Sequence, residues 1–170
     1  FRQVFKVLEL MGYSWVNKLH HIAFGMYRFK DAKLSTRKGN TIFLEDVFAR
    51  AIDLVQEVIA KKNPDLPDAA KVARQVGIGA VVFNDLVNDR VKDVEFDWER
   101  ALDFEGDSGP YVQYCGVRCA SLVRKYGRPV SRDFKTALNA PEELELMRIL
   151  LNYQDTLKNS FENFKPHILA

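Results

Sequence analysis

The spacing of apolar residues between positions 44 and 86 constrains the fold of this chain more than any other feature. Helical spacing is followed by Val47, Phe48, Ala51, Leu54, Val55, Val58 and Ile59, until "KKNPDLPD" interrupts with two prolines. Glu45 and Asp46 suit the positive end of this first helix, and Asp68 is the expected N-cap of a second helix over "AAKVARQVGIGAVVFNDLV". Gly77 and Gly79 weaken the middle of that helix but permit close contact with another helix. The pattern predicts a mainly α-helical protein.

The remaining segments add one strand region and more helices. "FRQVFKVLELMGY" has a helical apolar stripe that ends at Gly12. "LHHIAFGMYRF" reads as a strand or two short strands, because Ile22, Phe24 and Met26 alternate, and Gly25 permits close approach by a neighbour or a ligand.

The second half of the chain begins with "KDVEFDWERALDFEGDSG", which is acidic and turn-rich. It leads into the helix "PYVQYCGVRCASLVRKYG", with Pro110 in the first turn and Gly127 beyond the basic end. A last helix is predicted from "APEELELMRIL" into "FENFKPHILA". One side of it carries Leu144, Met147, Leu150, Leu151, Leu157, Phe161 and Phe164.

Charge and cysteine content narrow the function classes. With 25 Lys and Arg against 23 Asp and Glu, the net charge of +2 confines any nucleic-acid contact to local patches. No apolar run approaches the roughly 20 residues that span a bilayer, and no leader pattern opens the chain, so we expect a cytoplasmic protein. Phe1 in first place suggests a fragment. Cys115 and Cys119 offer no second ligand pair, so we expect small core residues and no metal site.

The loop "KLSTRKGN" at residues 33–40 holds three cations, two hydroxyls and a Gly-Asn pair between two apolar stretches. Hydroxyls, cations and backbone N–H groups that converge around a glycine are the usual means of holding phosphates. The Gly-rich run and the Gly-Lys-Ser/Thr end of a Walker loop are both missing. From the residues alone, a solvated charged turn remains the alternative to a phosphate site.

Four segments in order resemble one family. "KLSTRKGN" resembles the Lys-Met-Ser-Lys-Ser loop of class I aminoacyl-tRNA synthetases in its arginyl form, and "HIAFG" resembles the strand before that loop. "GIGAVVFNDL" is similar to the following helix, and "FDWERALDFEGDSGPYVQY" resembles the stretch that joins the catalytic and anticodon-binding domains. Together these segments cover most of residues 18–126.

The resemblance implies an ATP-dependent ligase that activates L-arginine as an adenylate and transfers it to tRNA(Arg). Cations placed where pyrophosphate charge develops lower the barrier. The resemblance assigns catalytic roles to Lys33, Ser35 and Arg37, and ATP with its Mg²⁺ as the cofactor. The expected ATP-binding residues are Phe24, Gly25, Met26, Lys33, Ser35 and Thr36.

Two departures from the family pattern bear on the active site. Thr36 stands where the general class I loop has a second lysine, so Arg37, a shifted loop, Mg²⁺ or residues elsewhere must supply that charge. The His-Ile-Gly-His element and the arginine pocket are absent from the chain. His20 and His21 lack the glycine and read as a packed or surface pair. The chain is therefore expected to carry half an active site.

The RNA side of the resemblance lies in "GPYVQYCGVRCASLVRK". Stackable rings and cations suit splayed RNA bases, and the expected tRNA-binding residues are Tyr111, Gln113, Tyr114, Arg118, Arg124 and Lys125. Tyr111 as a core residue is the alternative for that position. The family usually shows Ala-His-Ala-Arg where this chain has Cys115 to Arg118. Gly116 therefore leaves the role of that histidine in doubt, whereas Arg118 carries over.

The predicted organisation has two parts. Residues 1–107 form the C-terminal end of a Rossmann-type α/β catalytic domain with its helical connecting region, and residues 108–170 begin an α-helical anticodon-binding bundle of the DALR type that stays incomplete. A non-catalytic RNA-binding or scaffold module derived from such a synthetase is the rival interpretation. A sister enzyme such as the cysteinyl synthetase is disfavoured by Thr36-Arg37 and "GDSGPYVQY".

Overall fold

The computed structural model describes residues 1–29, 42–129 and 138–170. In chain order the elements are α1 (Arg2–Leu10), the 3-10 helix η1 (Val16–Lys18), β1 (Tyr27–Phe29), α2 (Leu44–Lys62), α3 (Ala69–Leu86), β2 (Val94–Phe96), α4 (Trp98–Ala101), α5 (Gly109–Tyr126), α6 (Pro141–Leu151), α7 (Tyr153–Glu162) and the 3-10 helix η3 (Pro166–Ile168). Helices dominate, which confirms the predicted class.

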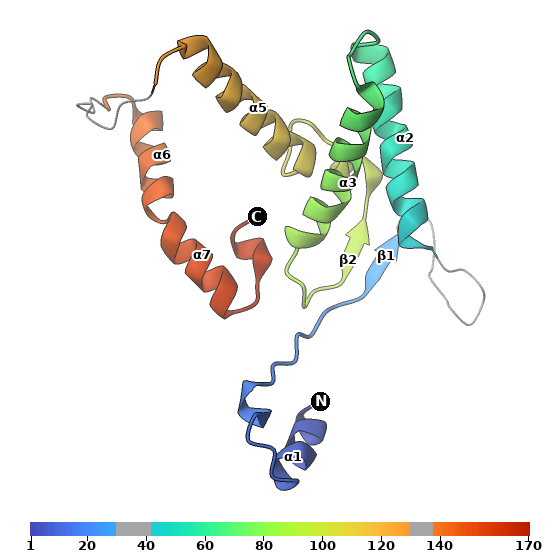
Figure 1. The fold of residues 1–170 in the computed structure, drawn as a ribbon, viewed down its shortest axis with the longest axis vertical. Coiled ribbons are helices and arrows are strands. Elements are labelled where there is room, and N and C mark those ends of the chain that lie inside the picture. Colours follow the sequence, from blue (N-terminus) through green and yellow to red (C-terminus); the bar gives the residue numbers. More distant parts are fainter. Residues whose placement is uncertain (30–41, 130–137) are drawn as a thin grey trace.

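A helix pair and a small parallel sheet form the centre of the molecule. Helices α2 and α3 lie side by side, and strands β1 and β2 pair in parallel from Tyr27 opposite Val94 to Phe29 opposite Phe96 (Figure 1). The chain passes from β1 through both helices to β2, as expected for the end of a Rossmann-type unit. The core cluster consists of Val47, Ala51, Val81, Phe96 and Ala101.

Glycines let the helices approach closely, as predicted. A Cβ at Gly77 would lie 2.9 Å from the Ile52 nitrogen, which belongs to the backbone of α2. A Cβ at Gly109, the first residue of α5, would lie 2.7 Å from the Gly79 carbonyl oxygen of α3. Both helix contacts therefore depend on the absence of a side chain.

The strand region differs from its prediction. Among the described residues before the gap at 30–41, the ladder contains only Tyr27–Phe29, and the alternating residues before it lie outside, because the segment opposite them is the turn that precedes β2. The stretch predicted as turn-rich contains β2 and α4. Asp97 begins α4, and its carboxylate accepts hydrogen bonds from the backbone N–H groups of Glu99 and Arg100 at 2.8 and 3.3 Å.

The predicted ends of α3 and α5 are correct in position. Ser108 caps α5 by accepting a hydrogen bond from the Tyr111 N–H at 3.2 Å, and Gly127 closes that helix with a φ of 65°. Asp68 immediately precedes α3, but its carboxylate makes no capping hydrogen bond in the described first turn because its own backbone is left-handed, with a φ of 57°.

The prediction of a single last helix from "APEELELMRIL" into "FENFKPHILA" is wrong, because the helix divides at Asn152 into α6 and α7. The Thr156 hydroxyl donates to the Asn152 carbonyl at 2.9 Å, a side-chain bond that often bends helices. Helices α5, α6 and α7 form an open arm. The end of this arm returns to the C-terminal end of α3 (Figure 1). Across the described parts of the chain, no helix combines the length and apolarity needed to cross a membrane.

Candidate functional site

The segment that leads into the 33–40 loop is held by the turn between α3 and β2. The Gly25 N–H donates to the Arg90 carbonyl at 2.7 Å, and the Met26 N–H donates to Asp93 Oδ1 at 2.8 Å. The Val94 N–H donates to the Met26 carbonyl at 2.9 Å, which continues into the strand ladder. The backbone is thus fixed at several consecutive points before β1 begins.

Gly25 is required by this packing. A Cβ at that position would overlap the Lys92 carbonyl. The prediction that Gly25 permits close approach is confirmed, and the neighbour that approaches is the backbone of the α3–β2 turn.

A hollow of about 240 Å³ opens beside the same segment. Phe24, Gly25 and Met26, all predicted as ATP-binding residues, line one wall of it. Arg90 and Lys92 line it as well. Phe24 is 83% exposed, so this wall is open to a ligand, and the lining carries two cations together with the carboxylate of Asp85.

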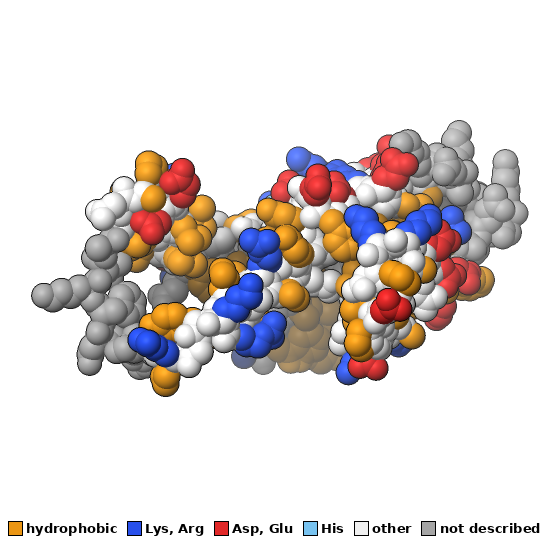
Figure 2. Space-filling view, turned by 90° about the horizontal axis from the view of Figure 1, so that it is seen from above, with side chains coloured by type: hydrophobic (Ala, Val, Ile, Leu, Met, Phe, Trp, Pro, Cys, Tyr) orange, Lys and Arg blue, Asp and Glu red, His pale blue; other side chains and the backbone are white. Residues whose placement is uncertain are grey.

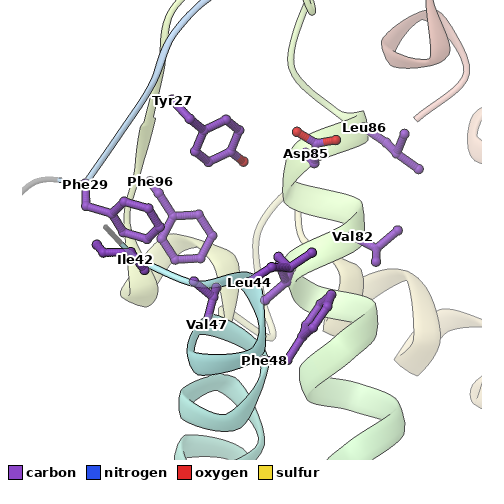
Figure 3. A pocket seen from close by; sticks show the side chains of 11 residues that line it. Tyr27, Phe29, Ile42, Leu44, Val47, Phe48, Val82, Asp85, Leu86 and Phe96 are labelled. Atoms are coloured by element: carbon purple, nitrogen blue, oxygen red, sulfur yellow. The ribbon is translucent and has the colours of Figure 1, made fainter. Parts of the chain in front are cut away.

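The loop itself lies outside the described residues, together with Lys33, Ser35, Thr36 and Arg37. Its two flanks are described: Phe29 and Ile42 both pack against the core cluster. They also line an apolar cavity of about 450 Å³ between the sheet and helices α2 and α3 (Figure 3). The core therefore anchors both flanks of the loop.

Tyr27 lines that cavity and is hydrogen-bonded to α3. Its hydroxyl accepts a hydrogen bond from Asn84 Nδ2 at 3.2 Å. Burial raises the pKa of Tyr27, and the negative charge of Asp85 raises it further, while the bond from Asn84 opposes both. Tyr27 is therefore a neutral wall residue at ordinary pH.

The six residues predicted to bind tRNA all lie on α5, which carries no acidic residue from Gly109 to Tyr126. Figure 2 shows Lys and Arg side chains spread along this part of the arm. The structure divides the six between two faces of the helix. Tyr111, Tyr114, Arg118 and Lys125 follow one helical stripe.

The stripe of Tyr111, Tyr114, Arg118 and Lys125 is exposed, and two of its side chains contact each other. Arg118 Nη1 donates to the Tyr114 hydroxyl at 3.1 Å, and the guanidinium carbon lies 5.7 Å from the ring centroid. Tyr114 and Arg118 therefore share one face of α5. Tyr111 is 41% exposed, so it is not a core residue.

The opposite face of α5 turns toward α3. Gln113 Nε2 donates to the Gln75 carbonyl at 3.3 Å, so this side chain fastens α5 to α3. Gln113 and Gly116 line a groove of about 1080 Å³ between the two helices. Arg124 continues that face toward the end of α5, and a Cβ at Gly116 would meet nothing within 4 Å.

The two cysteines were predicted wrongly as core residues. Cys115 and Cys119 are free thiols, and both are exposed. They lie on the side of α5 away from Gln113, and α3 covers only the Gln113 side. His20 and His21 are both exposed, and each ring packs on a phenylalanine: the centroid distance is 3.9 Å from His21 to Phe1 and 5.2 Å from His20 to Phe164.

Within the described residues, no three His, Cys, Asp or Glu side chains are placed to hold a metal ion. Sequence reasoning missed Arg90 and Asp93, whose side chains bind the segment before the loop. The cluster "NDRVKD" between a helix and a strand was their signal, since Asn and Asp are frequent in turns and an arginine there can reach backbone carbonyls.

The parallel strand pair with its crossing helices, followed by a helical arm, defines the class: the end of a Rossmann-type α/β domain joined to a helical unit. Residues 1–98 match the family "tRNA synthetases class I (R), catalytic domain", and residues 112–170 match "DALR anticodon binding domain". The chain belongs to the class I tRNA synthetase (R) family.

Named relatives agree with this family. The chain is 43% identical to an arginine–tRNA ligase of Clostridioides difficile and 42% identical to one of Clostridium botulinum, and in both cases all of this chain aligns with 30% of the relative. The solved structure of Thermus thermophilus arginyl-tRNA synthetase matches with a TM-score of 0.84 and 32% identity, over 97% of this chain and 27% of that one. The chain thus spans about a third of the length of these relatives.

Proposed function

We propose that this chain is part of an ATP-dependent arginine–tRNA ligase, which activates L-arginine as an adenylate and transfers it to tRNA(Arg). One observation carries the proposal: the whole chain aligns with proteins named arginine–tRNA ligase at 42 to 43% identity. The arginine pocket and the His-Ile-Gly-His element then belong to the part of the enzyme outside this chain, and the cytoplasm is the proposed compartment.

On the ATP side, Phe24, Gly25 and Met26 supply a wall for adenine. The hollow beside them supports this role, although the N–H and the carbonyl of Met26 already bond within the chain. Adenine would therefore contact the Phe24 side and the open surface of the segment, with Arg90 and Lys92 nearby.

The phosphates are assigned to the loop. Lys33 and Arg37 place positive charge where the pyrophosphate leaves, and the hydroxyls of Ser35 and Thr36 donate hydrogen bonds to phosphate oxygens. Donors aimed at developing charge accelerate the chemical step more than they tighten binding. Mg²⁺ fits as a companion of the ATP phosphates, since it is commonly bound through phosphates and few carboxylates.

On the RNA side, we infer a unit from residue 108 to residue 170 that follows the catalytic part at residues 1–107. Tyr111, Tyr114, Arg118 and Lys125 form its proposed contact stripe for tRNA, and their exposure and freedom from acidic neighbours support this assignment. Gln113, which holds α5 on α3, has a packing role that competes with RNA contact. Arg124 lies on the same side of α5, beyond the residues that line the α3–α5 groove, and stays a proposed RNA contact.

The experiment is arginine-dependent exchange of pyrophosphate into ATP by the full-length protein, with and without tRNA(Arg). Lys33→Ala should lower the rate of adenylate formation by roughly 100-fold, as the loss of single oxyanion donors does elsewhere. Lys61→Ala, an exposed lysine at the far end of α2, is the matched control and should leave the rate unchanged. The 170-residue chain alone should neither exchange pyrophosphate nor charge tRNA. A full-length protein that binds RNA yet never exchanges pyrophosphate would instead identify a non-catalytic module.

A further inference from the structure

Two segments far apart in the sequence meet at the turn between α3 and β2. On one side this turn binds the segment before the loop, through the hydrogen bonds to Gly25 and Met26 described above. On the other side it receives the end of the helical arm, where the chain leaves α7 at Phe164 and enters η3. Figure 1 shows η3 returning to the foot of α3.

A single side chain spans both segments. Arg90 Nε donates to the Phe164 carbonyl at 2.8 Å, and Arg90 Nη1 donates to the Ala23 carbonyl. A guanidinium presents several donors in one rigid plane, so the two carbonyls are held at a fixed separation. Lysine has a single ammonium on a flexible stem and cannot reproduce that fork.

Asp89, the residue before Arg90, contacts the same end of the arm. Lys165 Nζ lies 3.6 Å from Asp89 Oδ2, and His167 Nδ1 lies 3.9 Å from Asp89 Oδ1. The Asp89 side chain is only 19% exposed, so these contacts are partly shielded from solvent. Phe164 has a left-handed φ of 53°, a conformation that bulky residues adopt rarely and that is retained here where its carbonyl meets Arg90.

The returning segment also completes the hollow beside the predicted adenine wall. Pro166 lines that hollow together with Phe24, Gly25, Met26 and Arg90. The shape of the hollow therefore depends on residues from both ends of the chain, and Arg90 is the one lining residue that hydrogen-bonds to both among the described contacts.

We propose that Arg90 is a positioning residue that couples the end of the helical arm to the backbone before the phosphate loop. When the Phe164–His167 segment is docked, Arg90 is held and the Ala23–Met26 backbone is fixed. When that segment leaves, Arg90 loses one partner and the backbone at Gly25 loosens. The connection to ATP rests on the proposed function, whereas the coupling itself does not.

The test is hydrogen exchange, read by NMR at the amides of Gly25 and Met26 in the 170-residue chain. Lys165→Ala with His167→Ala removes the anchor on Asp89 and leaves Arg90 in place. We expect exchange at these two amides to rise about tenfold, the loss expected when a hydrogen bond to a charged group is weakened. In an Arg90→Ala background, the same double change should add nothing at these amides.

Controls separate this result from general loosening. Exchange at core amides of α2 and α3 reports global unfolding and should stay constant, and Arg74→Ala on α3 should leave Gly25 unaffected. If Arg90→Ala folds poorly, Arg90→Lys replaces it. Arg90→Lys should weaken the coupling, because one ammonium cannot bridge the carbonyls of Ala23 and Phe164. Unchanged exchange at Gly25 in the Lys165→Ala/His167→Ala chain, or an equal rise in both backgrounds, overturns the proposal.

A second measurement uses the full-length ligase. Arg90→Lys should raise the KM for ATP several-fold with a smaller change in kcat, because it disturbs the binding wall and not the reacting phosphates. An equal fall in kcat and kcat/KM would contradict a positioning role. If the full-length protein shows no ligase activity, the exchange result still decides the coupling.

Discussion

Replacing Gly77 with alanine tests the close contact between α2 and α3 on which the core depends. The new Cβ would lie 2.9 Å from the Ile52 nitrogen, 3.0 Å from the Ala51 carbonyl carbon and 3.1 Å from the Ala51 oxygen. All three are backbone atoms inside a helix, so they cannot turn aside as the end of a side chain could. The strain is relieved only if the two helices move apart.

The expected magnitude follows from two opposing effects. Alanine favours a helix over glycine by about 1 kcal/mol. Overpacking of a tight core costs about 1 to 3 kcal/mol. Separation of the helices also opens the contacts of Ala51 and Val55, which are almost fully buried. We therefore expect Gly77→Ala to lower the free energy of unfolding by about 1 kcal/mol or more.

Gly116→Ala is the matched control, because it makes the same chemical change within a helix of equal length. Its Cβ meets nothing within 4 Å, so only helix propensity applies. The free energy of unfolding should therefore rise by about 0.5 to 1 kcal/mol. Urea unfolding followed by circular dichroism, with hydrogen exchange in α2 and α5, measures both variants. If Gly77→Ala stabilised the chain as much as Gly116→Ala, the argument from close helix approach would be refuted.

Three further predictions address the arm. Under the proposed function, Arg118→Ala in the full-length protein should raise the KM for tRNA more than that for ATP and reduce the salt slope of tRNA binding by roughly 0.7 to 0.9, whereas Gln113→Ala should leave the slope unchanged; equal slopes for both variants would make Arg118 structural. Burial raises the pKa of Asp89, but the bond from the Val91 N–H and the charges of Lys165 and His167 outweigh it and leave the pKa below the ordinary 3.8. Asp89 therefore stabilises docking of the arm above pH 3.8, and this contribution is lost as the pH falls through its lowered pKa. The NMR shifts of η3 should change in acid, and Asp89→Asn should abolish that change. The 170-residue chain should self-associate through the apolar side of α6 and α7, where Phe161 is 78% exposed, and Phe161→Ser should weaken this; sedimentation of a monomer at high concentration would contradict it.

The helices of this chain were readable from the sequence because their apolar residues repeat over many turns. Both α2 and α3 begin and end close to the predicted residues, since acidic residues and prolines mark their limits. The close contact at Gly77 was also predictable, because a glycine within a helical apolar stripe usually has a packing reason.

The strands were harder to predict, for a physical reason. Val94–Phe96 has three residues, and only Phe96 is buried, so no alternation can develop. The strand exists because Tyr27–Phe29 offers a partner, which is information absent from the local sequence. The exposure of the cysteines likewise depends on which side of α5 is covered, and periodicity does not determine that.

The surroundings of the predicted site could be read from the sequence only in part, for the same reason. The resemblance placed Phe24, Gly25 and Met26 together, and they do line one hollow. Arg90 and Pro166 line it as well, yet they come from a turn and from the end of the arm, and their proximity follows only from the tertiary fold. The residues of the 33–40 loop remain predictions.

The parallel pairing of β1 and β2 has a consequence for how the protein is made. The Met26 N–H bonds to a side chain 67 residues further along the chain, so this hydrogen bond cannot form until that side chain leaves the ribosome. At about 5 to 20 residues per second, this wait lasts roughly 3 to 13 s. Helices α2 and α3 emerge within the interval and can pair first, because their contact is local. Their pairing shortens the span that the strands must close, so the nascent helix hairpin should act as the template on which β1 later finds β2.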